Sequence, residues 1–298
     1  MDANVALIEK VAPAIVSLQI QVPAGHPSVW ALGAERMGSG TLIDSSGLIL
    51  TVNYVVMGAE KITVTLSDGR SLPGEIVAQD FDSGIAVLRI PLPFTPFAEP
   101  VSSQSLEVGQ PVFVMAGTGD EGRKGSGGLV TYLGPFDAHW EYMLDRAIMT
   151  TAINPGFGGG GLFTMKGNLV GVVSLNLSEL LRSTMAIPVE YFQDYRDEFL
   201  TLGQRIRTAR GWIGFYTQPL EGGLVVASVV PYGPAQISGL HEGDIILGIN
   251  SRDISNRVEL YSELWKKKPG ESVVLNILRE KELKSVEVVC SSREEFYR

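Results

Sequence analysis

The chain has 298 residues, a length at which about two domains are expected. Hydrophobic residues make up 45% of it and charged residues 19%, an ordinary globular composition that excludes disordered, collagen-like and coiled-coil proteins. The net charge of −9 lies in residues 1–205, with 12 basic against 21 acidic residues, whereas residues 206–298 hold 12 of each, so no basic stripe is available for nucleic acid or an anionic membrane. This change in charge balance predicts a domain boundary near residue 205.

The first two thirds of the chain consist mainly of short β-branched runs. Apolar residues at helical spacing predict a short helix over residues 3–11, which Pro13 ends. Ten strand-like runs separated by Gly, Asp and Ser follow between residues 14 and 175, as in a β-barrel or a β-sandwich. The proline-rich stretch 91–105 interrupts this series, so we expect two β-barrels joined by that linker.

The last third has the pattern of a separate module. Pro188 stands where a first helical residue is favoured, and the apolar spacing over residues 189–202 predicts an amphipathic helix at the boundary. Residues 211–290 are expected to form strands with two short helices. The second of these helices begins at Asn256, with Glu259 three residues later in a capping-box arrangement, and ends at a run of three lysines.

Cysteine and histidine usage limits the chemistry of the chain. The single cysteine, Cys290, excludes internal disulfides, and its valine-rich surroundings predict a buried small apolar residue. The histidines fall in apparent loops without metal-ligand spacing, so we expect neither a metal site nor another cofactor. They are His26, His139 and His241.

No signal for a membrane or for secretion is present in these residues. No run of about 18 apolar residues occurs, so no membrane-spanning helix is predicted. The opening residues MDANVALIEK lack a basic start followed by a long apolar stretch, so they are not predicted to be a signal peptide. The residues by themselves therefore leave the localisation open.

Three stretches carry a resemblance to a known family. They are GSGTLIDSSGLILTVNYVV at 38–56, DSGIAVLRI at 82–90 and AINPGFGGGGLF at 152–163. In order and spacing the chain resembles the HtrA/DegP family of trypsin-like serine proteases with a C-terminal PDZ domain. The resemblance covers essentially the whole length. It implies a mainly β fold, with a double six-stranded β-barrel in residues 1–205 and a PDZ domain in residues 206–298.

The catalytic triad of that family is not matched here. Catalysis there uses a serine nucleophile, a histidine that takes its proton and an aspartate that orients the histidine. In this chain Tyr54 stands at the histidine position, Gly84 at the aspartate position and Gly158 at the serine position. A phenol, which titrates near pH ~10, is a poor general base at neutral pH. Because losing one triad member already costs several orders of magnitude in rate, we expect an inactive protease homologue.

A glycine-rich loop surrounds the nucleophile position. The backbone of Gly156, Phe157 and Gly158 would offer N–H groups where the family has its oxyanion hole. Four consecutive glycines are entropically costly to order, however, so a flexible loop is favoured over a working anion site. Tyr54 and Phe157 place two aromatic side chains where histidine and asparagine stand in the family, so we expect the cleft to be partly filled.

The second module contains a candidate peptide-binding loop. GWIGF at residues 211–215 resembles the loop of the family in which backbone N–H groups capture a peptide C-terminus, and residues 233–250 resemble the PDZ stretch beneath it. PDZ domains bind a peptide by adding it as a strand to an exposed sheet edge. The alternative is that the large side chains of this loop are ordinary core residues. The expected peptide-binding residues are Trp212, Ile213, Gly214 and Phe215.

The function predicted is that of a catalytically inactive HtrA-like protein. It would bind peptides or protein C-termini through its PDZ domain and act as a scaffold or regulator. Two alternatives stay open, namely residual or altered hydrolysis and an engineered inactive form of an active protease. Asp82 and Ser83 precede Gly84, but neither is expected to replace the missing histidine and serine.

Further expectations come from the resemblance. It implies a role in protein quality control, an extracytoplasmic or cell-envelope location, and either a homo-oligomer or association with an active homologue. Trimers of the family form through N-terminal segments, and the predicted first helix carries an apolar pattern that little else in a monomer would bury. The apolar residues are Val5, Leu7, Ile8 and Val11.

Overall fold

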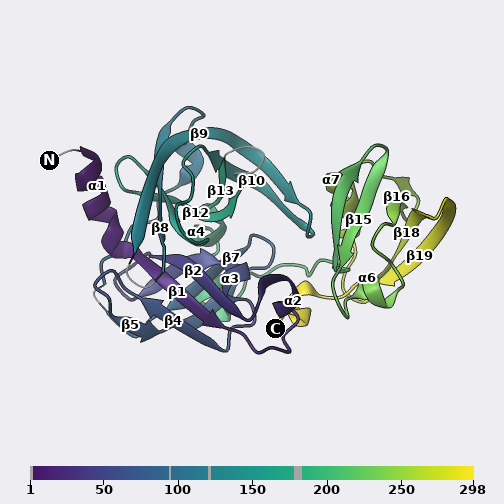
Figure 1. Ribbon diagram of the computed structural model, residues 1–298, viewed down its shortest axis with the longest axis horizontal. Coiled ribbons are helices and arrows are strands. Elements are labelled where there is room, and N and C mark those ends of the chain that lie inside the picture. Colours follow the sequence, from purple (N-terminus) through teal and green to yellow (C-terminus); the bar gives the residue numbers. More distant parts are fainter. Residues whose placement is uncertain (1–2, 94, 120–121, 178–182) are drawn as a thin grey trace. The chain divides into compact units, whose positions relative to one another are not determined.

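The computed structural model describes residues 3–93, 95–119, 122–177 and 183–298. The chain divides into two compact units (Figure 1). The first unit contains Met1–Pro135 and Asp145–Ile206, and the second contains Phe136–Leu144 and Arg207–Arg298. Both are built mainly from β-strands, which confirms the predicted fold class of a trypsin-like domain followed by a PDZ domain.

The first half of the first unit is an antiparallel sheet. Its strands are β1 (Ile15–Gln21), β2 (Glu35–Leu42), β3 (Leu48–Val52), β4 (Lys61–Thr65), β5 (Ser71–Pro73), β6 (Glu75–Gln79) and β7 (Ile85–Arg89). They lie in the order β5-β4-β1-β2-β3-β7-β6. This half therefore has seven strands where six were expected, because the short β5 extends the edge of the sheet beside β4.

The second half of the first unit is a closed six-stranded barrel, as expected. Its strands are β8 (Pro111–Gly117), β9 (Arg123–Ala138), β10 (Tyr142–Thr150), β11 (Gly161–Thr164), β12 (Leu169–Asn176) and β13 (Thr184–Pro188). They close in the order β10-β13-β12-β11-β8-β9 around buried aliphatic side chains such as Val114, Ile148 and Leu162. The β9–β10 hairpin is long, and its tip, Phe136–Leu144, belongs to the second unit (Figure 1).

Short helices accompany these strands. They are α1 (Ala3–Val11), the 3-10 turn η1 (Ala12–Ala14), α2 (Val29–Leu32), α3 (Asn53–Val56), the 3-10 turn η2 (Ser103–Ser105), α4 (Glu190–Gln193) and α5 (Arg196–Leu202). The predicted N-terminal helix is confirmed. No helix among the described residues is long and apolar enough to cross a membrane.

The prediction of one continuous helix after Pro188 is wrong. Pro188 ends β13, and two helices separated at Tyr195 follow. Tyr195 leaves the helical conformation (φ −123°, ψ 19°), and its ring packs beneath the Arg205 guanidinium, 3.8 Å from the ring centroid. A tertiary contact thus overrides the helical spacing of the apolar residues.

The second unit contains a six-stranded sheet with three helices. Its elements are β14 (Phe215–Leu220), β15 (Gly223–Val229), α6 (Pro234–Ile237), β16 (Ile245–Ile249), β17 (Arg252–Asp253), α7 (Arg257–Leu264), β18 (Ser272–Arg279), β19 (Glu282–Val289) and α8 (Arg293–Phe296). The sheet order is β14-β15-β16-β18-β19, with β17 paired to β16, so β14 is an edge strand. The predicted capping box is confirmed, since the Asn256 side chain accepts the Glu259 N–H at 2.9 Å. Cys290 is buried in the core, also as predicted.

Candidate functional site

Tyr54 lies in the short helix α3, which directly follows the buried strand β3. The buried side chain of Arg36 holds the carbonyl end of this helix, because its guanidinium donates hydrogen bonds to the carbonyl oxygens of Tyr54 (3.0 Å) and Met57 (2.8 Å). Burial lowers the pKa of Arg36 to about 10. Nothing in the sequence pattern identified Arg36, which fixes the position of α3 and of the tyrosine on it.

The Tyr54 hydroxyl is engaged with the protein backbone. It donates a hydrogen bond to the carbonyl oxygen of Ser174 in β12 at 2.8 Å. Burial raises the pKa of Tyr54 to about 12. The phenol is therefore protonated at neutral pH and its proton is directed at a backbone oxygen, so the geometry does not equip it to accept a proton from a nucleophile.

Gly158 lies against this hydroxyl. A Cβ atom on Gly158 would be 2.0 Å from the Tyr54 hydroxyl oxygen, far inside van der Waals contact. Tyrosine thus occupies the space that a side chain at position 158 would require. Next to it, Gly159 has φ +96° and a Cβ there would lie 2.1 Å from the Ser39 carbonyl oxygen, so this position admits only glycine.

The glycine loop is held by tertiary hydrogen bonds. The flexible loop that the glycine run predicted is therefore not what the structure contains, because strands on either side supply partners for its backbone. The amides of Gly156 and Phe157 are used within the protein. The four bonds are Gly156 N–H to Asn154 Oδ1 (3.2 Å), Phe157 N–H to the Gly117 carbonyl (3.1 Å), Gly159 N–H to the Val173 carbonyl (2.7 Å), and Ser39 N–H to the Gly158 carbonyl (2.7 Å).

Gly84 stands at the third of the three expected triad positions. Its carbonyl oxygen accepts the N–H of Asn53, the residue before Tyr54, at 2.7 Å. The structure therefore brings Tyr54, Gly84 and Gly158 together, as the resemblance implies. Gly84 has φ +78°, a left-handed conformation that costs a non-glycine residue roughly 1–2 kcal/mol.

The polar residues beside Gly84 interact with one another. The Ser83 hydroxyl donates to Asp80 Oδ2 at 2.7 Å, and the Asp82 N–H donates to Asp80 Oδ1 at 3.1 Å. Arg205 forms an ion pair with the buried Asp80 at 3.1 Å. These bonds shape the turn that carries Gly84, and Ser83 has its hydroxyl directed at a carboxylate that is already paired with a guanidinium.

The predicted peptide-binding loop lies just before β14 in the second unit. Ile213 and Phe215 are fully buried members of the core. Their side chains are therefore core residues, as the alternative interpretation of this loop expects. The Trp212 ring packs on Phe296, with ring centroids 4.8 Å apart, and its backbone bridges to Ser291. The groups of this loop that could bind a ligand are therefore those of its backbone.

The N–H groups of this loop converge on one carboxylate. The Glu141 side chain accepts hydrogen bonds from the N–H groups of Gly214 (2.7 Å), Phe215 (3.2 Å) and Ile213 (3.3 Å). Gly214 has φ +80°, which turns these amides toward a common point. Glu141 was not identified from the sequence, because its partners lie more than 70 residues away along the chain.

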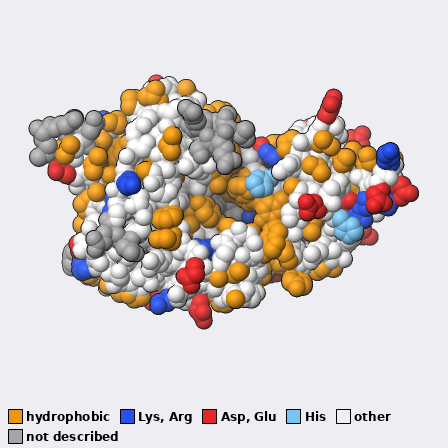
Figure 2. All heavy atoms as spheres, viewed as in Figure 1, with side chains coloured by type: hydrophobic (Ala, Val, Ile, Leu, Met, Phe, Trp, Pro, Cys, Tyr) orange, Lys and Arg blue, Asp and Glu red, His pale blue; other side chains and the backbone are white. Residues whose placement is uncertain are grey.

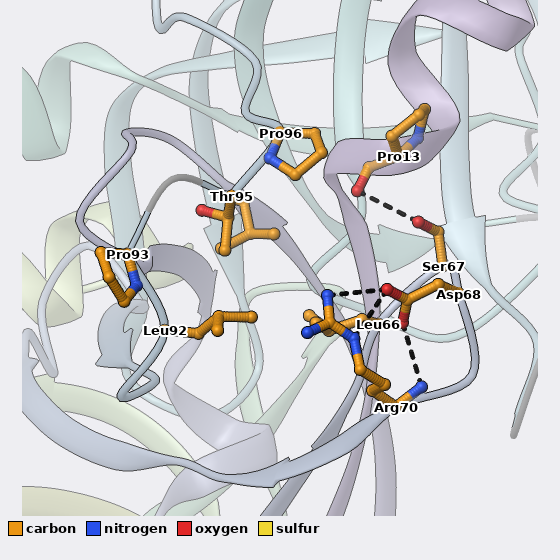
Figure 3. A pocket seen from close by; sticks show the side chains of 10 residues that line it. Pro13, Leu66, Ser67, Asp68, Arg70, Leu92, Pro93, Thr95 and Pro96 are labelled. Atoms are coloured by element: carbon orange, nitrogen blue, oxygen red, sulfur yellow. Dashed lines mark hydrogen bonds and ion pairs between the residues drawn. The ribbon is translucent and has the colours of Figure 1, made fainter.

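Other polar features of the described residues do not form a site of this kind. A pocket in the first unit is lined by Leu66, Pro93 and Pro96 and edged by the exposed ion pair of Asp68 and Arg70, and it includes none of the three expected triad positions (Figure 3). No three His, Cys, Asp or Glu residues of the described chain are grouped as a metal would require. On the face drawn in Figure 2, basic side chains of the described residues are scattered.

Comparisons with known proteins match both halves of the chain. Residues 38–172 match the trypsin-like peptidase domain, and residues 211–289 match the PDZ domain. The chain is 31% identical to a probable periplasmic serine endoprotease DegP-like of Pseudomonas fulva and 29% identical to the protein so named in Halomonas elongata, over 87% and 85% of its own length. The chain thus combines an HtrA/DegP-like trypsin-like peptidase domain with a PDZ domain. It spans 56% of the length of each of these two relatives.

Two solved protease structures have a similar fold over nearly the whole chain. The serine endoprotease from Yersinia pestis is 26% identical, with a TM-score of 0.58 and 98% coverage of both chains. The HtrA-type protease AlgW with tripeptide is 25% identical, with a TM-score of 0.60 and 97% coverage of both chains. The chain therefore has a fold similar to that of these two proteases.

Proposed function

We propose that this HtrA-like chain does not hydrolyse peptide bonds and acts by binding peptides or protein C-termini through its PDZ domain. The observation that carries the proposal is the contact between Tyr54 and Gly158, where the tyrosine hydroxyl fills the space of a nucleophile side chain. A trypsin-like mechanism needs a nucleophile, a base and an orienting acid at these places. In this chain they are glycine, a phenol whose pKa burial raises to about 12, and glycine.

The neighbouring groups support the same conclusion. Ser83 and Asp80 bond to each other, and Asp80 also pairs with Arg205. The amides of Gly156 and Phe157 bond to Asn154 and to the Gly117 carbonyl. Residual hydrolysis would need a base within reach of Gly158, and the proton of the nearest candidate, Tyr54, is bonded to a backbone oxygen.

The PDZ domain provides the binding activity in this proposal. Backbone N–H groups of Ile213, Gly214 and Phe215 already hold a carboxylate, which is the chemistry that captures a peptide C-terminus. The edge strand β14 and helix α7 supply the two walls of the groove. We further propose a domain boundary at residues 205 and 206 and, because the relatives are named periplasmic, a location outside the cytoplasm.

The proposal is tested by activity and labelling measurements on the chain as it stands. We expect no turnover of unfolded casein and no covalent labelling by a serine-directed phosphonate, because Gly158 has no side-chain hydroxyl to act as a nucleophile. A positive control is the DegP-like relative of Pseudomonas fulva. Stoichiometric labelling of this chain at the cleft, or turnover within about tenfold of the relative, would overturn the inactive assignment.

A further inference from the structure

The tip of the β9–β10 hairpin, Phe136–Leu144, is part of the second unit. Helix α7 and the edge strand β14 form the walls of the peptide groove of a PDZ domain, and the loop before β14 closes one end. Each of these three elements contacts the tip through hydrogen bonds or an ion pair, as described below. The tip is therefore bound in the manner of a ligand.

The carboxylate of Glu141 occupies the closed end of the groove. It is the only group that bonds all three loop amides among the hydrogen bonds of the described residues, at 2.7 to 3.3 Å. The residue is 3% exposed and adopts φ +55°, an uncommon conformation for a non-glycine residue. Arg293 of α8 donates a hydrogen bond to the Glu141 carbonyl oxygen at 3.2 Å and holds the residue in this position.

The backbone before Glu141 contacts the edge strand. The N–H of Thr217 in β14 donates to the carbonyl oxygen of His139 at 3.0 Å. The rings of His139 and Tyr216 lie with their centroids 5.6 Å apart. This is the kind of main-chain bond by which an added strand pairs with a sheet edge, here made by the chain itself.

Helix α7 binds the tip from the opposite wall. The buried Tyr261 hydroxyl donates to the Ala138 carbonyl oxygen at 2.9 Å and accepts the Glu141 N–H at 3.1 Å. Arg257, at the start of the same helix, forms an ion pair of 2.6 Å with Asp137. A segment of five residues, 137–141, thus satisfies donors on both walls and in the loop.

We propose that the segment 137–141 is an internal ligand of the PDZ groove, with the Glu141 side-chain carboxylate in the place of a peptide C-terminal carboxylate. This inference rests on the proposed function of the groove as a peptide site. A peptide with a free C-terminus competes with the hairpin tip for the same three amides, and its binding releases the tip.

The test compares the full chain with Glu141→Ala, with Glu141→Gln, which keeps the size of the side chain, and with Glu242→Ala as a matched control at an exposed glutamate. Hydrogen exchange of the amides of Ile213, Gly214 and Phe215 reports whether the loop is occupied. Calorimetry with peptides that end in apolar residues, as free acids and as C-terminal amides, reports access to the groove.

We expect Glu141→Ala to exchange these amides at least about tenfold faster than the unmodified chain and to bind free-acid peptides about tenfold more tightly, which is the effect of removing the group that accepts their hydrogen bonds. Glu141→Gln keeps an acceptor oxygen without the charge, so it should protect the three amides at least as well as the unmodified chain at neutral pH. Glu242→Ala should behave like the unmodified chain. Equal exchange and equal affinity in all four proteins would overturn the internal ligand. Faster exchange without any peptide binding would instead overturn the proposed peptide site and leave the bound hairpin supported. Should Glu141→Ala fail to fold, Glu141→Gln decides instead, because its three loop amides should exchange more slowly than those of the unmodified chain above about pH 7. Equal exchange in these two proteins would overturn the internal ligand.

Discussion

The hydroxyl oxygen of Tyr54 lies 2.0 Å from the position that a Cβ atom on Gly158 would take. Any residue other than glycine at position 158 therefore requires the tyrosine to move. The tyrosine is held by its bond to the Ser174 carbonyl, and the helix that carries it is held by Arg36. The residue types at positions 54 and 158 are thus linked, because the Tyr54 side chain leaves room only for glycine at position 158.

Gly158→Ser should destabilise the protein by about 1–3 kcal/mol through overpacking and should not yield turnover. The loss of stability is expected to be smaller in a Tyr54→Ala background, since the clash is then absent. Urea unfolding of the four members of this cycle measures the coupling, and casein hydrolysis measures turnover. Gly25→Ser is the matched control, because a Cβ there meets nothing within 4 Å. Robust turnover in Gly158→Ser alone would reveal an unrecognised base.

The combined variant Tyr54→His, Gly84→Asp and Gly158→Ser is expected to show weak hydrolysis, whereas each single replacement shows none. Gly84→Asp should limit its stability, because φ +78° costs a non-glycine residue roughly 1–2 kcal/mol. Casein turnover and urea unfolding of the single and combined variants provide the comparison. Unchanged stability of Gly84→Asp would contradict the role of the left-handed conformation at this turn.

Gly214→Val should disrupt peptide binding far more than Arg252→Ala. A Cβ at Gly214 would lie 2.9 Å from the Trp212 ring, and φ +80° is unfavourable for a β-branched residue. Arg252 is exposed, and its ion pair with Glu263 lies at the surface, where such pairs contribute little. We expect the parent affinity to be micromolar, about −8 kcal/mol, and Gly214→Val to weaken it by at least about tenfold. Calorimetry in the Glu141→Ala background avoids competition from the hairpin. Equal losses of peptide affinity in Gly214→Val and Arg252→Ala would refute the prediction.

Peptide access to the groove should increase as the pH rises. Burial raises the pKa of Glu141 from 4.5 to about 7, although the loop amides and Arg293 lower it in part. A carboxyl group whose pKa is higher in the bound tip than in the released tip favours the bound tip below pH ~4.5, and this preference is lost as the pH rises to about 7. The apparent affinity for a free-acid peptide should therefore rise between about pH 5 and 7.5, by at most about tenfold per pH unit.

Other titratable groups also lie near Glu141. Burial raises the pKa of four acidic groups that interact with Glu141, and burial lowers the pKa of His139. Glu141→Gln keeps His139 and is the control, since its affinity should lose most of the pH dependence. An identical pH profile in both proteins would assign the effect to His139. The four groups are Tyr216, Tyr261, Cys290 and Tyr297.

The N-terminal helix offers a test of self-association. Val5 and Ile8 in α1 are 45% and 44% exposed, while Val11 is buried. We expect the chain to associate at micromolar concentration through these two side chains, and Val5→Asp with Ile8→Asp to shift it toward the monomer. Sedimentation velocity measures both. A stable monomer of the unmodified chain at that concentration would remove the prediction.

The sequence by itself determined the features that depend on local spacing. Alternating β-branched runs predicted the strands, and the Asn256 and Glu259 pair predicted the start of α7. The trypsin-like and PDZ domains were implied by the resemblance of the chain to a known family. The residue types at positions 54, 84 and 158 were also readable, because each position lies within one of the stretches that carry the resemblance.

Only the tertiary structure decided how those residues meet. The order of the glycine loop comes from bonds to Gly117 and Val173, and the break at Tyr195 accompanies its contact with Arg205. Glu141 reaches the loop at Gly214 over 73 residues of chain. Contacts between residues so far apart leave no period in the sequence, since they depend on how strands and hairpins pack rather than on neighbouring side chains.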